Sequence, residues 1–510
     1  MCKTSEEQQL RPNHRFFLRP VGSSFNSVHI AQGFSTRKSK PSAFLPQEET
    51  GYWRDVPARK DMSARIDAYF EKSTYNPDPK LLSNAVWKVR NMFSKYSPNK
   101  LKPLSIIEAI DALPSGTSAG MPFVPGVKKG QARNKLIRLA KLQWRRVASK
   151  KRILVAPCIA GTRRTLRPKG ENKPRLIWAY PGYINVLESQ FSIPVFNLKP
   201  KFIAWSINWF DNGRSFDRIQ TSFNAGCVMN LDFSAFDSTV SGHLIRQAFS
   251  VVRSLYDLDL IESQMLRQLE DYFIHTPLAM YDRIITKHRG IPSGSAFTQL
   301  IGSIVNMIAC TYVCDLYHTI DLIHEESIWL GDDSLLKFRW NLGDDFMRNE
   351  FLRPFKHLGL NVNSSKTIVS RYGASHTHKF LGREIRILEQ AIDVDMVKLK
   401  AQALQPEFDD KVPGDAYTRI VGLAWIYGVQ LDAWKYLLQL ALHLKKNFDS
   451  LDECSRIDYR FLHQFGISED MLGSFPNRTE ILKRQLGINQ MDLSVLWWSG
   501  LRGSAALIQR

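Results

Sequence analysis

A Gly-Asp-Asp tripeptide lies between two short apolar runs in the stretch Ser327-Ile328-Trp329-Leu330-Gly331-Asp332-Asp333-Ser334-Leu335-Leu336-Lys337-Phe338. The pattern predicts two strands joined by a tight turn, in which glycine supplies the backbone freedom that the reversal needs. Such a hairpin projects two adjacent carboxylates, and like charges this close resist joint ionisation unless a cation lies between them. Asp332 and Asp333 are therefore candidate ligands of Mg²⁺ or Mn²⁺.

The same tripeptide recurs at Gly343-Asp344-Asp345 in a different setting. Polar residues precede this copy, and a helix-like segment, 346–358, follows it. Its two aspartates fit the first turn of a helix, where negative charge is favoured. An isolated Gly-Asp-Asp is more often a solvated turn than a metal site. Because only the first copy lies between apolar strands, it alone is the candidate metal site.

Composition describes a folded protein with a polyanionic partner. The 510 residues carry a net charge of +20, yet 44% of them are hydrophobic and 11% aromatic, unlike a basic disordered tail. Six cysteines lack the paired spacing of a zinc site, which fits a reducing, intracellular setting. The apolar run 300–314 is shorter than a membrane span and predicts a buried helix, so we expect no membrane partner.

Positive charge concentrates between residues 128 and 175, where seventeen Lys or Arg residues accompany a single acid, Glu171. Part of this region, 131–151, is helix-like, and a charge run is usually a solvated helix face. Phosphate contacts explain so unequal a balance better. At its end, Lys173 and Arg175 lead directly into a strand-like run, which predicts a finger that binds a triphosphate.

An apolar strand, 227–231, runs into Asp232, and Asp237 follows shortly after it. An aspartate at the end of a strand can simply cap the next turn or helix. Combined with the Gly-Asp-Asp hairpin about a hundred residues later, Asp232 becomes a third candidate metal ligand.

Between these acidic motifs lies a Gly/Ser loop, Gly290-Ile291-Pro292-Ser293-Gly294-Ser295-Ala296-Phe297-Thr298-Gln299-Leu300. It opens a long helix-like segment, 301–316, and offers backbone N–H groups and hydroxyls to phosphates or ribose. The simpler interpretation is a loop whose Ser or Thr caps the helix. Its place between the two acidic motifs favours the functional interpretation.

The order of these motifs resembles motifs A to E in the palm of viral RNA-dependent RNA polymerases. The loop 290–300 and Leu330-Gly331-Asp332-Asp333-Ser334 are most similar to the polymerases of partitiviruses, small double-stranded RNA viruses, with picobirnaviruses as near neighbours. Thr117-Ser118-Ala119-Gly120-Met121-Pro122 is similar to their motif G, and Lys173-Pro174-Arg175 to motif F. The resemblance covers roughly residues 115 to 385.

The resemblance implies an α+β, helix-rich right-hand polymerase. An N-terminal arm would occupy residues 1–75, and fingers with motifs G and F would occupy 76–225. The palm, with an antiparallel sheet and an interleaved fingers segment, would span 226–385. A helical thumb would follow at 386–510.

The resemblance also assigns roles at the site. Asp232, Asp332 and Asp333 would hold two Mg²⁺ or Mn²⁺ ions, and Lys366 would donate a proton to pyrophosphate. The nucleotide would contact Lys173, Arg175, Asp237, Ser293, Gly294, Thr298 and Asn306. RNA would contact Thr117, Ser118, Gly120 and Arg383. One departure is Gly302, because several related families carry Asn at that position; here an Asn, Asn306, comes one helical turn later.

The function implied is template-directed RNA synthesis, both transcription and replication of a double-stranded RNA genome. Template and product RNA, rNTPs and a capsid protein are the expected partners, in the virion interior or the host cytoplasm. A reverse transcriptase is the first alternative, although such enzymes usually carry an aromatic residue before Asp-Asp and a bulky gate near the position of Asp237. A non-catalytic RNA-packaging or capsid protein is the second, suggested by the net charge alone.

Overall fold

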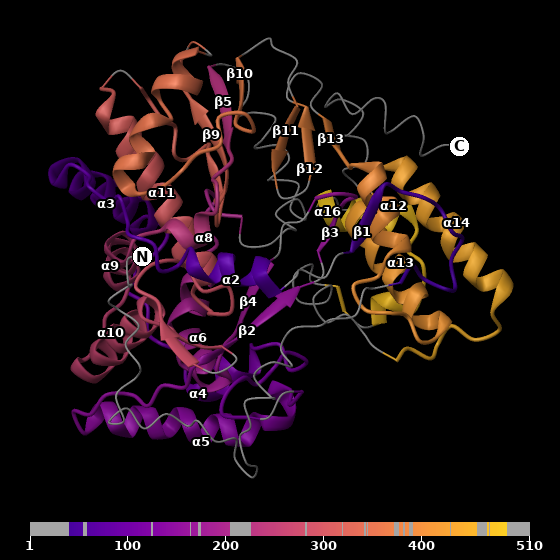
Figure 1. Cartoon of the computed structure of the whole chain (residues 1–510), viewed down its shortest axis with the longest axis horizontal. Helices are drawn as coiled ribbons and strands as arrows, with labels where there is room; N and C mark the ends of the chain where they lie inside the picture. Colours follow the sequence, from indigo (N-terminus) through magenta and orange to yellow (C-terminus); the bar gives the residue numbers. More distant parts are fainter. Residues whose placement is uncertain are drawn as a thin grey trace.

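The computed structural model describes residues 40–54, 59–123, 126–163, 165–171, 175–204, 226–280, 283–318, 320–340, 343, 345–371, 377–380, 383–386, 391–428, 430–455, 467–468 and 470–486. Of the predicted site residues, Lys173 lies outside these ranges. Figure 1 shows the arrangement, with the segment that carries the Gly-Asp-Asp hairpin in the upper part and a separate group of helices on the right.

A four-stranded antiparallel sheet, in the order β10-β5-β9-β8, forms the predicted palm. Its strands are β5 (Cys227–Leu231), β8 (Ile328–Leu330), β9 (Asp333–Phe338) and β10 (Ile368–Arg371). All five side chains of β5 are buried, because both faces of the sheet are covered. The strand at 227–231 and the hairpin around Gly-Asp-Asp are thus confirmed.

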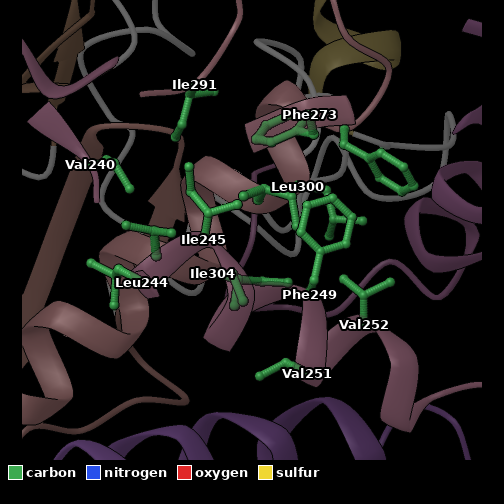
Figure 2. Packing of buried hydrophobic residues seen from close by; sticks show 14 of the residues in the cluster. Val240, Leu244, Ile245, Phe249, Val251, Val252, Phe273, Ile291, Leu300 and Ile304 are labelled. Carbon is green, nitrogen blue, oxygen red and sulfur yellow. The ribbon is translucent and has the colours of Figure 1, made fainter. Parts of the chain in front are cut away.

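Helices pack beside this sheet around one hydrophobic cluster. They are α3 (Pro79–Ser94), α9 (Gly242–Ser254), α10 (Leu260–Ile274) and α11 (Thr298–Leu316). Figure 2 shows Phe249 of α9 among apolar side chains that include Phe273 of α10 and Leu300 and Ile304 of α11. The ring of Phe249 lies 5.5 Å from that of Phe273 and 5.1 Å from that of Phe297. Edge-to-face contacts of this kind add specificity to the buried area.

Helix α11 is long and apolar enough to cross a membrane, with a mean hydropathy of 1.4 over a window of its 19 residues. In the structure 83% of that window is buried inside the protein. The buried helix predicted over 300–314 is therefore confirmed, and it forms the centre of the core beside the palm sheet.

A second sheet, in the order β4-β2-β6-β7, belongs to the predicted fingers. Its strands are β2 (Cys158–Arg163), β4 (Arg175–Ala179), β6 (Pro277–Met280) and β7 (Arg283–Thr286). Three helices pack against one another beside it: α4 (Ile106–Asp111), α5 (Lys129–Ala148) and α6 (Gly182–Asn197). The pairing of β2 with both β4 and β6 brings residues from the two sides of β5 in sequence into one sheet.

The C-terminal helices form their own hydrophobic cluster. They are α12 (Met396–Leu404), α13 (Pro413–Tyr427), α14 (Leu431–Asn447) and α16 (Arg478–Leu486), accompanied by a short 3-10 turn at Asp470–Leu472. A small antiparallel sheet precedes them, formed by β11 (Thr377–Phe380), β12 (Arg383–Arg386) and β13 (Ala391–Asp393). This helical region matches the predicted thumb, whereas the domain boundaries remain predictions.

The N-terminal segment connects the C-terminal helices to the predicted fingers. Leu45 is buried in the thumb cluster, and the N–H of Ser42 donates to the carbonyl of Leu404 at 2.9 Å. Further along, β1 (Tyr52–Arg54) pairs with β3 (Leu166–Pro168) of the fingers. Next comes α2 (Arg59–Asp67), which packs near β4. The described part of the predicted arm thus lies on the rest of the protein.

Candidate active site

The Gly-Asp-Asp hairpin has a two-residue loop, because Leu330 pairs with Asp333 across it. Gly331 adopts a φ of +61°, in the left-handed region that favours glycine. A positive φ at the first of two loop residues is typical of a type II′ turn, which matches the twist of the flanking strands. Asp332 is exposed at the tip of the turn. The hairpin therefore presents its carboxylates at one end of the palm sheet.

Asp232 lies at the same end. It directly follows β5, and the pairing of Leu231 with Ser334 brings it opposite Asp333. Burial raises the pKa of the Asp333 carboxyl to about 7, and the charges of Asp332 and Asp232 add to the shift. Asp333 thus feels the negative charge of both other acids, as expected for like charges at the same end of a sheet.

Asp237 belongs to the same electrostatic cluster. It lies in the short helix α8 (Phe236–Thr239), just beyond Asp232. Although Asp237 is exposed, the surrounding protein limits its solvation and raises its pKa to about 7, and the charge of Asp332 contributes. Arg175, the exposed first residue of β4, opposes the shift at both Asp237 and Asp333. A cation from the fingers therefore acts on the palm carboxylates.

No three His, Cys, Asp or Glu side chains lie close enough to hold an ion in the part of the chain that the structure describes. The carboxylates nevertheless suit a hard divalent cation, which prefers oxygen ligands. A cation would also remove the electrostatic cost that raises the pKa of Asp333. Mg²⁺ commonly binds through one or two carboxylates and completes its shell with water and substrate phosphates. Asp232, Asp332 and Asp333 fit ions of this kind.

Helix α11 holds the backbone of the Gly-Asp-Asp turn. Ser303 Oγ accepts a hydrogen bond from the N–H of Gly331 at 2.8 Å. Asn306 Nδ2 donates to the carbonyls of Gly331 and Asp332, at 3.1 and 3.2 Å. Both side chains are completely buried. Three backbone groups of the turn are thus satisfied by one helix, which fixes the direction of the carboxylates.

These contacts argue against the predicted contact between Asn306 and the nucleotide. Its amide nitrogen is bonded to the turn, and its Oδ1 accepts from the thiol of Cys310 at 3.2 Å. The structure also explains Gly302. A Cβ at this position would lie 3.3 Å from Gly331 Cα, so a side chain here would press on the turn. Glycine allows the close approach that the two hydrogen bonds require.

The Gly/Ser loop packs on β4 and on the segment after Asp232. Ser293 Oγ lies 3.3 Å from the N–H of Trp178, and a Cβ at Gly294 would meet the Trp178 carbonyl at 1.9 Å. Thr298 Oγ1 donates within the loop, to the carbonyl of Pro292 at 2.6 Å. The N–H of Ile291 donates to the Asp237 carbonyl at 2.6 Å. The predicted residues of this loop therefore lie between the fingers strand and Asp237.

Two buried ionisable residues support this loop, and neither was expected from the sequence. Glu188 of α6 is fully buried, and its Oε2 accepts from Ser295 Oγ at 2.7 Å and from the N–H of Ala296 at 2.8 Å. Burial raises its pKa to about 8. Lys287 is also fully buried, and its Nζ donates to the carbonyl of Gly290 at 2.8 Å. The available signal for Glu188 was a single acid in an apolar helix.

Lys366 lies in an exposed turn before β10. This turn borders Asp232, because the N–H of Asn363 donates to the Asp232 carbonyl at 2.7 Å. On the same side, the Asp232 N–H lies 3.4 Å from Thr367 Oγ1. The lysine is thus on a segment attached to the candidate metal ligand, and its role remains a prediction.

The predicted RNA-binding residues occupy two places. Thr117 and Ser118 lie in a loop before α5, where Lys129 Nζ donates to Thr117 Oγ1 at 2.9 Å. Gly120 has a φ of +60°, and a Cβ there would meet the Tyr180 carbonyl at 2.1 Å. Arg383 is the first residue of β12, in the sheet before the thumb.

Residues 37–404 match a protein family described as viral RNA-dependent RNA polymerase. The chain belongs to this family. The match covers the palm sheet, the Gly/Ser loop and the fingers strand that carries Arg175. It confirms the family predicted from the motif order, and the reverse transcriptase and RNA-packaging alternatives are set aside.

Relatives of the polymerase agree with this assignment. The chain is 42% identical over 439 residues to the RNA-directed RNA polymerase of Cryptosporidium parvum virus 1 (strain KSU-1), covering 82% of this chain and 84% of that protein. It is 26% identical over 258 residues to the genome polyprotein of a human hepatitis A virus, genotype IA (isolate GBM), of which it spans 11%. The resemblance to partitivirus polymerases is confirmed.

Solved structures show the same fold. The RNA-dependent RNA polymerase of a human picobirnavirus superposes with a TM-score of 0.61 at 16% identity, covering 98% of this chain and 94% of that one. A mutant of that enzyme that lacks an insertion loop superposes with a TM-score of 0.56, covering 90% of this chain and 85% of the mutant. The right-hand fold and the picobirnavirus neighbourhood predicted from the sequence are confirmed.

Proposed function

We propose that Asp232, Asp332 and Asp333 hold two divalent ions, Mg²⁺ or Mn²⁺, while the polymerase joins rNTPs on an RNA template. The observation that supports the proposal is the position of these three acids at the same end of the palm sheet, with the charge of Arg175 acting on Asp333 from the fingers. Bound ions would lower the pKa of the attacking 3′-hydroxyl and neutralise the triphosphate. Positioning and electrostatics then supply most of the catalysis.

Arg175, together with Lys173, binds the triphosphate in this proposal. A guanidinium next to the carboxylates offsets part of the negative charge that an incoming nucleotide adds, and it matches phosphate geometry with two donors. Lys366, on the turn that borders Asp232, donates a proton to the departing pyrophosphate. The exposed position of both Arg175 and Lys366 leaves them accessible to a substrate.

Asp237 inspects the ribose in this proposal. The 2′-hydroxyl is both donor and acceptor and is the group that distinguishes RNA from DNA. The Asp237 carboxylate can accept a hydrogen bond from this hydroxyl. Ser293, Gly294 and Thr298 belong to the Gly/Ser loop, which is hydrogen-bonded to the backbone of Asp237 through Ile291. Asn306 takes a positioning role, because its amide holds the catalytic turn.

RNA lies along Thr117, Ser118 and Gly120 before the active site and along Arg383 after it. The enzyme transcribes and replicates a double-stranded RNA genome, with a capsid protein as its partner, in the virion interior or the host cytoplasm. Similarity over 84% of a viral RNA-directed RNA polymerase and the fold shared with a picobirnavirus enzyme support this setting.

The test is incorporation of labelled rNTPs, and separately dNTPs, on a single-stranded RNA template with Mg²⁺ or Mn²⁺. We expect template-dependent rNTP incorporation, its loss in Asp232→Ala, and a reduced preference for rNTPs over dNTPs in Asp237→Ala. Full activity of Asp232→Ala would contradict the assignment of the metal ligands. Incorporation confined to dNTPs, or RNA binding without any incorporation, would contradict the proposed reaction.

A further inference from the structure

Helix α5 has one buried and one strongly basic face. The side chains packed inward are apolar apart from one glutamine: Ala132, Leu136, Ala140, Gln143 and Val147. At 3.6 residues per turn, Arg138, Lys141 and Arg145 point to the opposite side, with Lys135 beside them, and all four are exposed. Figure 1 shows α5 along the lower edge of the molecule, with α4 and α6 on its inner side. We call these four residues the basic ridge.

The charge of the basic ridge is not balanced by neighbouring acids. No Asp or Glu occurs in the sequence between residues 112 and 170. The nearest acid before this region, Asp111, is bonded to Arg133 instead, at 2.6 Å. Among the described residues, no ion pair involves any of the four ridge side chains. Mobile counterions therefore neutralise the ridge, and their release favours binding of a polyanion.

Helix α5, which carries the ridge, begins beside the loop to which the proposed function assigns template contacts. The N–H of Lys129 donates to the carbonyl of Thr117 at 2.8 Å, and Ser118 forms a bridge with Lys128. A strand that touches this loop can therefore continue onto α5. Ten residues of helix separate Lys135 from Arg145, a length of about 15 Å. A length of this order spans several consecutive phosphates of an RNA strand.

We propose that the basic ridge binds the sugar–phosphate backbone of template RNA outside the active site. Lysine and arginine that contact only phosphates position a strand without reading its sequence. The ridge thus increases affinity for long templates and leaves the chemical step unchanged. The proposal rests on the proposed function, because the direction of the strand follows from the template contacts of Thr117 and Ser118.

The test compares two triple variants that remove the same charge. One is Arg138→Gln/Lys141→Gln/Arg145→Gln; the control is Lys80→Gln/Lys356→Gln/Lys446→Gln, exposed lysines on three separate elements. We expect the ridge variant to raise KM for a long template about tenfold with kcat unchanged, and to leave a template that fills only the active site unaffected. The slope of log K against log salt should fall by about 0.7 per lost phosphate contact, about 2 in total.

Equal affinities of the ridge and control variants for the long template would overturn the proposal, once thermal melting shows that both are folded. So would an unchanged salt slope. Unaltered RNA binding together with lost binding of purified capsid protein would assign the ridge to a protein partner instead. Failure of the proposed function would look different, because wild type would then incorporate nothing on either template while the ridge could still bind RNA.

Discussion

The chain contains the tripeptide Gly-Asp-Asp twice, and the two copies differ in everything that surrounds them. The first joins β8 to β9, lies opposite Asp232, and is hydrogen-bonded to α11. In the second, Gly343 and Asp345 precede a single helical turn, Phe346–Glu350, and Asp345 is exposed; Asp344 lies outside the described residues. Identical residues thus belong to a rigid hairpin in one place and to the start of a helical turn in the other.

The comparison shows that chemistry follows from the surroundings of the carboxylates. At the start of a helical turn, free backbone N–H groups stabilise negative charge. At the first copy, burial and neighbouring acids work against the negative charge of Asp333 and raise its pKa to about 7. Only the first copy therefore gains substantially from a bound cation.

The largest difference is expected for the carboxylates themselves. We predict that Asp332→Asn lowers kcat/KM for rNTP incorporation by about 10³-fold or more, because a proposed metal ligand is lost. Asp345→Asn, which makes the same chemical change, should stay within about twofold of wild type. Steady-state incorporation on one RNA template measures both. Comparable losses in the two variants would remove the distinction between the copies.

The contacts from α11 should have the next largest effect. Ser303→Ala and Asn306→Leu each leave polar groups of the first turn without a partner, and we predict a ten- to hundredfold decrease in kcat. Thr311→Val is the matched control, since Thr311 is equally buried on the same helix but bonds to Met307 and His324. All three should cost about 1–3 kcal/mol of unfolding free energy. An activity loss in the control equal to that of Asn306→Leu would mean that stability alone controls activity.

The buried carboxyl of Glu188, which supports the Gly/Ser loop near the first copy, predicts that the free energy of unfolding depends on pH. Its folded-state pKa of about 8 exceeds the unfolded value of about 4.3, so its contribution to stability is complete at low pH and is lost as pH rises through about 8. Glu188→Gln cannot ionise, so its stability relative to wild type should be greater at pH 9 than at pH 6 by on the order of 3 kcal/mol. Denaturant unfolding at pH 6 and pH 9 measures the difference. If the stability difference between Glu188→Gln and wild type were the same at pH 6 and pH 9, Glu188 would not titrate in this range.

The smallest difference concerns the two glycines. Gly331 has a φ of +61°, and a Cβ there would lie 3.1 Å from Gln299 Oε1. Gly331→Ala should therefore cost about 1–3 kcal/mol of unfolding free energy. Among the described residues, a Cβ at Gly343 would come within 4 Å of Arg371 Nη2 alone, at 4.0 Å, so Gly343→Ala should be neutral or stabilising by up to about 1 kcal/mol. Equal costs in thermal or denaturant unfolding would contradict this difference in backbone conformation.

The sequence predicted the parts of the site that depend on local patterns. The strand before Asp232, the hairpin around Asp332 and the apolar helix after the Gly/Ser loop each follow from neighbouring residues, because alternation, turn glycines and apolar runs are local signals. The family resemblance then supplied the fold and the reaction, and the family match confirmed both.

The rest depended on contacts between distant residues. Ser303 lies 28 positions from Gly331, whose N–H donates to it, and Glu188 lies 107 positions from Ser295, whose hydroxyl donates to it. No spacing rule connects such pairs before the chain is folded. Asn306 illustrates the consequence, since its place one turn after Gly302 suggested a ribose contact, whereas its amide bonds to the backbone of the turn.

Binding of Mn²⁺, followed by electron paramagnetic resonance in wild type, Asp332→Asn and Asp345→Asn, tests most directly the claim that only the first copy is a metal site. The measurement does not depend on turnover, and nucleotide can be added to complete the ligand shell. We predict that wild type and Asp345→Asn bind Mn²⁺ equally and that Asp332→Asn binds it at least tenfold more weakly. Equal binding by Asp332→Asn, or weakened binding by Asp345→Asn, would contradict the claim.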